Sequence, residues 1–272
     1  MIAVLKHELH IYFRSLTAYV FGAFLLAFVG LGSMLYNLQA AVSNFEFVLS
    51  FGCLVFVVIV PILTMRVIAE ERKLKTDQLL YSLPISTTEV VLGKYLALLL
   101  VYLLPLCIIS LYPLFFSQFG DVYLPTSYGS IFAFFLLGAA LIAVGVFISS
   151  LTDNQGFAAG IGIAVILFNY YSVSLSVIIF ALALIIRYVT RSDSIAYAFC
   201  IILLAALAIL CWVDTQALEG LLPGIMTALS LFERFYVFVN GVFDMTGVVY
   251  YLSVIVFFLF LSVQSLEKRR YN

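Results

Sequence analysis

The 272-residue sequence is 65% hydrophobic and only 10% charged, with a mean hydropathy of +1.20. Water-soluble domains carry about 25% charged residues, so this composition excludes an ordinary soluble protein. The long apolar runs are continuous rather than alternating, which also argues against an outer-membrane β-barrel. The net charge of −1 indicates no class of partner, and we predict no binding to nucleic acid. The sequence therefore predicts an all-α polytopic membrane protein that forms one domain, 1–272.

Apolar stretches long enough to cross a bilayer as a helix recur along the chain. We predict about eight membrane-spanning helices, at 17–36, 47–66, 90–117, 128–150, 154–171, 173–189, 195–213 and 246–265. The boundary between the fifth and sixth spans is the weakest, because only 169–172 interrupts one long apolar stretch.

The orientation follows from the basic residues, since lysine and arginine accumulate in cytoplasmic loops. If the N-terminus is inside, all 13 basic residues except Arg234 fall on the inner segments or at their edges. Seven spans would place one end of this pattern on the wrong face. We therefore predict that both termini are cytoplasmic.

The residues that most often bind metals are few here. The four cysteines lie inside apolar runs and are interpreted as small hydrophobic side chains, not as ligands or disulfides. The chain has only two histidines, His7 and His10, in an interfacial setting. We therefore predict no metal site and no cofactor bound by this chain.

The first segment, 1–16, is predicted to form an interfacial elbow helix. Its apolar side chains recur every three or four residues, at Ile2, Leu5, Leu9, Phe13 and Leu16. The other face carries Lys6, His7, Glu8, His10 and Arg14. A helix with this pattern lies flat in the membrane interface. The candidate elbow residues are Leu5, Leu9, Phe13 and Arg14.

The second inner segment, 66–89, is the most structured polar stretch of the sequence. We expect the second span to continue past the membrane into water, where four charged residues solvate it: Glu70, Glu71, Arg72 and Lys73. Thr76 is then placed to cap a short new helix. That helix would present an apolar face and stop at a proline: Leu79, Leu80, Leu83 and Pro84.

The same segment ends with a second start signal. Ser86 followed three residues later by Glu89 is a capping-box pattern at the start of the third span. A loop that only connects two spans does not need so much specification. We therefore interpret 66–89 as a surface that docks a partner, with a solvated charged hairpin as the alternative.

A third inner signal lies between the fourth and fifth spans. Thr152 and Gln155 are spaced for another capping box, and Asp153 lies between them in a tight turn without basic residues. This pattern suits a buried cytoplasmic corner.

The outer segment 214–245 is half apolar. Ser230 and Glu233 form a capping-box pattern, and Gly241 supplies a C-terminal stop. We predict a short amphipathic helix that lies at, or dips into, the outer interface. A hairpin merely packed on the bundle is the open alternative.

These features together resemble the ABC-2-type permeases, with GldF-like and NosY-like subunits as the nearest types. The resemblance covers most of the chain and rests on four groups of residues. They are Met65-Arg66 with Ala69-Glu70-Glu71-Arg72-Lys73, Leu79-Leu80 with Leu83-Pro84-Ile85-Ser86, Val91-Leu92-Gly93-Lys94-Tyr95, and the stretches 147–155, 232–244, 249–253 and 265–270.

Two departures from the family pattern stand out. Lys75 occupies the position before the loop threonine where the family usually has glycine, which we expect to stiffen the turn. The family commonly has six spans, so 173–213 is interpreted as an inserted hairpin of two.

The resemblance implies a permease subunit of an ATP-driven transporter, most simply an exporter, in the cytoplasmic membrane of a bacterium. Two permease chains, identical or related, would pair among the membrane lipids, and separate ATPase subunits would dock on the inner loops. The sequence contains no G-x-x-x-x-G-K-[ST] phosphate-binding loop, because Gly93-Lys94 is followed by Tyr95. ATP and Mg²⁺ would therefore bind to the partner, and the chain would not be an enzyme by itself.

Two other functional classes would require features that this sequence largely lacks. An ion-coupled secondary transporter requires charges or broken helices near the bilayer midplane, and Asn169 with Tyr170 is the one weak candidate. An intramembrane enzyme requires ionisable groups that face one another within the spans, where this sequence has almost none.

Overall fold

The computed structural model describes residues 1–76, 86–171 and 229–270. Within these ranges the chain is helical and contains no strand, as predicted. It forms two compact units, one of Met1–Ile166 with Arg234–Asn272 and one of Leu167–Glu233. The predicted spans 173–189 and 195–213 lie outside the described residues, as does the part 214–228 of the predicted outer segment.

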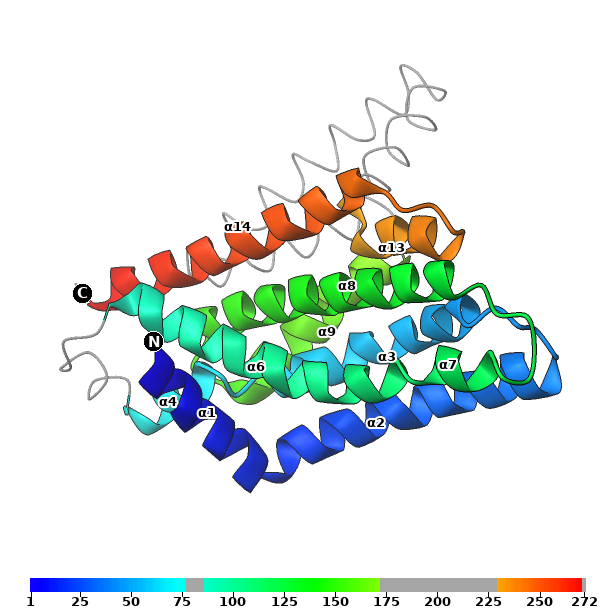
Figure 1. Cartoon of the computed structure of the whole chain (residues 1–272). Helices are drawn as coiled ribbons and strands as arrows, with labels where there is room; N and C mark the ends of the chain where they lie inside the picture. The colour runs from blue at the N-terminus through cyan, green and yellow to red at the C-terminus, as the bar shows by residue number, and fades with distance from the viewer. Residues whose placement is uncertain (77–85, 172–228, 271–272) are drawn as a thin grey trace, which may run out of the picture. The chain divides into compact units, whose positions relative to one another are not determined.

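Figure 1 shows the order of the helices. They are α1 (Ile2–Arg14), α2 (Leu16–Gly32), the π-helix η1 (Ser33–Gln39), α3 (Glu46–Thr64), α4 (Ala69–Leu74), α6 (Thr87–Ile109), α7 (Tyr112–Phe116), α8 (Leu124–Leu151), α9 (Gln155–Tyr171), α13 (Leu231–Val239) and α14 (Met245–Arg270).

Five helical stretches of the described chain are long and apolar enough to cross a membrane. They are Leu16–Gln39, Glu46–Leu74, Thr87–Phe116, Leu124–Leu151 and Met245–Arg269. These stretches coincide with the predicted first, second, third, fourth and eighth spans. Helix α9 coincides with the predicted fifth span but is a shorter apolar helix. The chain is therefore a multi-pass membrane protein, and the total of eight spans stays a prediction.

Helix α8 is the centre of the larger unit and packs against α3, α6 and α14. Two of its glycines allow this close packing. A Cβ atom at Gly145 would overlap the Thr64 hydroxyl of α3, and one at Gly138 would lie 2.6 Å from the Tyr102 ring of α6. The Tyr102 hydroxyl also donates a hydrogen bond to the Phe134 carbonyl of α8, at 2.8 Å.

The predicted signals around α13 are confirmed. The Ser230 hydroxyl accepts a hydrogen bond from the Glu233 amide at 3.2 Å, and Gly241 has a φ of +83° just after the helix. Asn169 of α9 also contributes, because its side-chain oxygen accepts from the Leu231 amide at 2.8 Å. The side-chain amide of Asn169 therefore bonds to the backbone at the first residue of α13.

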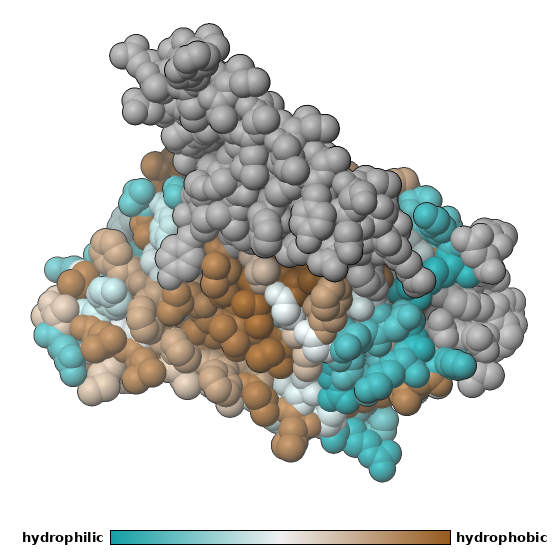
Figure 2. All heavy atoms as spheres, turned by 180° about the vertical axis from the view of Figure 1, so that it is seen from behind, coloured by the Kyte–Doolittle hydropathy of each residue, from teal (hydrophilic) through white to brown (hydrophobic). Residues whose placement is uncertain are grey.

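Several segments that are distant in the sequence meet at one end of the larger unit, where both termini lie (Figure 1). We call this the termini end; it comprises α1, α4, the first turns of α6, the turn 151–155 and the last turns of α14. The Thr87 hydroxyl donates to Glu267 at 2.9 Å, and Arg269 pairs with Asp153 at 2.7 Å. Figure 2 shows polar residues gathered at this end and hydrophobic ones over the middle of the helices.

Candidate functional site

The ammonium group of Lys94 joins three segments at the termini end. Its Nζ lies 2.6 Å from Glu8 Oε1 on α1, 2.7 Å from Glu71 Oε1 on α4 and 2.9 Å from the carbonyl oxygen of Val67. A lysine ammonium has three N–H donors, so all of them are used. The Lys94 side chain is only 2% exposed. We call Lys94, Glu8 and Glu71 the lysine cluster.

Local sequence places Lys94 at this point. Helix α6 begins at Thr87 because the Ser86 hydroxyl accepts from the Glu89 amide at 3.2 Å, which confirms that predicted cap. Gly93 then lets α1 approach, since a Cβ atom there would lie 3.0 Å from that of Val4. Lys94, the next residue, extends between α1 and α4.

The structure corrects the predicted faces of the elbow helix. Val4, Glu8 and Tyr12 form its buried stripe, although Glu8 was assigned to the exposed polar face. Glu8 turns inward because Lys94 offers it a buried cationic partner. Leu5 and Leu9 are half-buried, whereas Phe13 and Arg14 are exposed. Burial and the nearby Glu8 carboxylate raise the pKa of Tyr12 above its ordinary range.

The second span was expected to continue as a helix through Lys73, and the structure breaks that helix at a turn. Helix α3 ends at Thr64, four residues turn, and α4 begins at Ala69. The reason is Ser149 of α8, whose hydroxyl accepts from the amides of Ile68 and Ala69, both at 3.1 Å. It also donates to the Met65 carbonyl at 3.2 Å. One buried hydroxyl thus fixes the turn between α3 and α4 to α8.

The four charged residues of α4 are not equally solvated, which corrects a second prediction. Glu70 binds Arg66 through two hydrogen bonds of 2.9 Å, and Glu71 belongs to the lysine cluster. The Arg72 side chain is 1% exposed and lies 3.9 Å from Asp153. Only Lys73 is exposed. Three of the four charges are therefore partly or fully withdrawn from solvent, because Arg66, Lys94 and Asp153 lie close enough to pair with them.

The predicted capping box at Thr152 and Gln155 is wrong. The Thr152 hydroxyl accepts from the Asn154 amide at 3.2 Å, and the Asn154 side chain accepts from the Gly156 amide at 3.0 Å. Asn154 is therefore the cap of α9, and Gln155 is the first residue of the helix. The corner is partly buried as predicted, since Thr152 is 3% exposed while Asp153 is exposed.

The remaining predicted site residues divide into two groups. The Thr76 hydroxyl donates to the Glu71 carbonyl at 3.2 Å. The Glu89 carboxylate lies 3.8 Å from the N-terminal amine of Met1. The other four fall outside the described residues: Leu79, Leu80, Leu83 and Pro84. Within the described ranges, no group of three histidine, cysteine or acidic side chains could hold a metal ion.

Sequence reasoning did not identify Glu8, Lys94 or Ser149 as members of this site. The one available signal was the position of Lys94 near the edge of the apolar run 91–117. A lysine buried there would require a carboxylate partner, because charged side chains are almost never fully buried unless paired. Nothing in the sequence indicated which carboxylates would serve.

A family profile described as ABC-2 family transporter protein matches residues 33–211, more than half of the chain. The chain belongs to the ABC-2 transporter family. The match includes the predicted docking segment 66–89 and the turn 151–155. No curated protein and no solved structure matches the chain. Membership of this ABC-2 family identifies a transporter permease and implies an ATPase partner in the assembled transporter.

Proposed function

We propose that this ABC-2 protein is the membrane subunit of an exporter in a bacterial cytoplasmic membrane, of the GldF-like or NosY-like type. Two permease chains would form the transport path, and a separate ATPase subunit would bind ATP and Mg²⁺. Segment 66–89 would receive that subunit on the cytoplasmic side. The observation that carries the proposal is the lysine cluster, because it ties α4 of this segment to α1 and α6.

The cluster suits the transmission of a movement. All three Lys94 donors are used, and each bond goes to a different segment: α1, the turn before α4, and α4 itself. If α4 moved while Lys94 stayed in place, the buried ammonium would lose the Glu71 carboxylate, and a buried charge without its partner is costly. Ser149 extends the same linkage to α8. A push on 66–89 would thus move several spans together, as a two-state bundle requires.

The partner is tested first. A tagged chain would be purified from its native membranes in mild detergent, and co-purifying proteins would be identified. We expect an ATPase subunit in comparable amount and Mg²⁺-dependent ATP hydrolysis by the complex. A chain that purifies alone and transports its substrate on an ion gradient would overturn the proposal in favour of a secondary transporter.

The docking segment is tested with Leu79→Asp/Leu80→Asp. Two buried carboxylates would disrupt an apolar contact, so we expect loss of substrate-stimulated ATP hydrolysis, with normal membrane insertion and permease yield. Leu79→Met/Leu80→Met is the matched control and should keep activity, because it preserves apolar volume. Full coupled transport by the aspartate variant would exclude this segment as the docking surface.

A further inference from the structure

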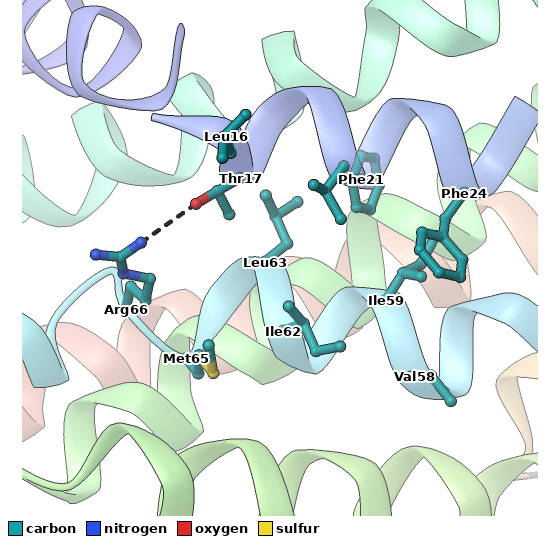
Figure 3. A pocket seen from close by; sticks show the side chains of 11 residues that line it. Leu16, Thr17, Phe21, Phe24, Val58, Ile59, Ile62, Leu63, Met65 and Arg66 are labelled. Atoms are coloured by element: carbon teal, nitrogen blue, oxygen red, sulfur yellow. Dashed lines mark hydrogen bonds between the residues drawn. The ribbon is translucent and has the colours of Figure 1, made fainter. Parts of the chain in front are cut away.

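A groove of about 270 Å³ lies between α2 and α3 (Figure 3). Its walls are apolar and include Val20 and Phe24 of α2 and Val58 and Ile62 of α3. At the end nearer α1 and α4 it is bordered by Thr17 and Arg66. The groove is therefore apolar along its length and polar at one end, where the Arg66 guanidinium is paired with the Glu70 carboxylate.

The apolar walls fit a hydrocarbon chain. Both α2 and α3 belong to stretches that can cross a membrane, so these walls face acyl chains in a bilayer. Phe24 is 52% exposed and Val58 is 50% exposed, although both are large apolar side chains. A straight apolar groove next to the hydrocarbon favours an extended acyl chain over a polar solute.

The polar end offers donors for an anion. A guanidinium group has five N–H donors in a planar fork. Three bonds of Arg66 are accounted for, two to Glu70 and one of 3.3 Å from Nη1 to the Thr17 hydroxyl. Further N–H donors remain, and the Thr17 hydroxyl proton is free to donate. Glu70 holds the fork in place, and Arg14, an exposed cation, precedes Thr17 by three residues in the chain.

We propose that this groove binds an anionic phospholipid, with one acyl chain between α2 and α3 and the phosphate on Arg66 and Thr17. The geometry sets the lipid at the interface of the leaflet on the termini end. Arg66 lies in the turn between α3 and α4 and pairs with Glu70 of α4. The bound lipid therefore contacts the same turn that Ser149 fixes to α8, and connects the membrane to segment 66–89.

Native mass spectrometry of the purified transporter, in nanodiscs of equal phosphatidylglycerol and phosphatidylcholine, tests this site. We expect phosphatidylglycerol to be retained in preference to phosphatidylcholine. Arg66→Gln should lower its retention about tenfold, because a charge-assisted hydrogen bond is lost. Val58→Trp should fill the groove and lower the retention of both lipids.

Two further variants keep the test decisive if Arg66→Gln unfolds. Thr17→Val leaves the Arg66–Glu70 pair intact and should lower phosphatidylglycerol retention by a smaller factor. Lys73→Gln removes an exposed cation of α4 that does not border the groove and should change nothing. The readout needs no ATP hydrolysis, so its failure is separable from failure of the proposed export function.

Equal retention of the two lipids by the wild-type transporter would overturn the proposal. So would an equal loss in Lys73→Gln and Arg66→Gln, because the effect would then be a general one of charge. A disulfide formed in native membranes between Val58→Cys residues of two permease chains would show that a second copy covers the groove, which also excludes the lipid.

Discussion

The two ends of the larger unit are held together by different kinds of contact. At the termini end, charged groups join distant segments, as in the lysine cluster and in the pair of Arg269 with Asp153. At the opposite end, aromatic rings from segments that are distant in the sequence pack against one another. Phe45 lies 5.9 Å from Tyr112, and Phe132 lies 6.3 Å from Phe243, between ring centroids.

This difference has a physical consequence. A ring contact weakens gradually as the rings shift, because its dispersion energy is a sum over many atom pairs. A buried ammonium with every donor used has few acceptable arrangements, because a lost partner leaves a charge unpaired. The termini end is therefore suited to discrete rearrangement, and the ring-packed end is suited to holding the helices in place.

The largest expected effect is that of Lys94→Met. It leaves the Glu8 and Glu71 carboxylates near one another without their shared cation, which should cost about 3–5 kcal/mol of folding free energy. We expect a large fall in the thermal unfolding midpoint of the detergent-solubilised protein. Intrinsic fluorescence during heating measures it.

Two controls separate charge from packing in that experiment. Lys73→Met changes an exposed lysine and should stay within about 0.5 kcal/mol of wild type. The triple variant Glu8→Gln/Glu71→Gln/Lys94→Met removes all three charges and should recover most of the loss. If the triple variant is as unstable as Lys94→Met, the lysine contributes through its packing and the comparison of the two ends fails.

At the opposite end, Ser127→Ala should have a smaller effect. Its hydroxyl donates to Glu46 Oε1 at 2.8 Å, and within the described chain the other carboxylate oxygen of this buried residue has no hydrogen-bond partner. We expect a loss of about 1–3 kcal/mol. The loss is smaller than for Lys94 because Glu46 lies in the first turn of α3, where the helix dipole favours a negative charge.

The matched control is Ser130→Ala on the same helix. Ser130 is equally buried, but its hydroxyl donates to the uncharged carbonyl of Phe238 at 3.1 Å. Its loss should cost about 1 kcal/mol. Equal unfolding midpoints for the two variants would mean that the Glu46 charge does not matter at this end.

The sequence predicted local features well and long-range ones poorly. The caps at Ser86 and Ser230 and the stop at Gly241 depend on residues within a few positions, so their patterns are sufficient. Glu8 and Lys94 are 86 positions apart, and their pairing depends on how α1 packs on α6. The spacing of apolar residues along the sequence does not show how two helices pack on each other. Hydrophobic periodicity even placed Glu8 on the wrong face.

Some predictions failed because two neighbouring residues could play the same role. Thr152 and Asn154 are both good caps, and only the folded turn decides that Asn154 caps α9. Likewise, Glu70 and Glu71 were expected in water because charged residues are usually exposed. Both are only half-buried, and their pairing could be predicted only from where Arg66 and Lys94 lie in the fold.

The smallest predicted effect concerns Lys75, where the family pattern has glycine. Lys75 has φ +57° and ψ 21° after α4, and its amide and that of Thr76 bond to the Arg72 and Glu71 carbonyls. This is a Schellman C-cap, whose left-handed residue is usually glycine. Lys75→Gly should therefore stabilise the protein by about 1 kcal/mol, because it relieves the Cβ contact. Lys75→Ala keeps the Cβ atom and should give no gain in the unfolding midpoint. A gain equal to that of glycine would instead trace the cost to the lysine charge among its basic neighbours.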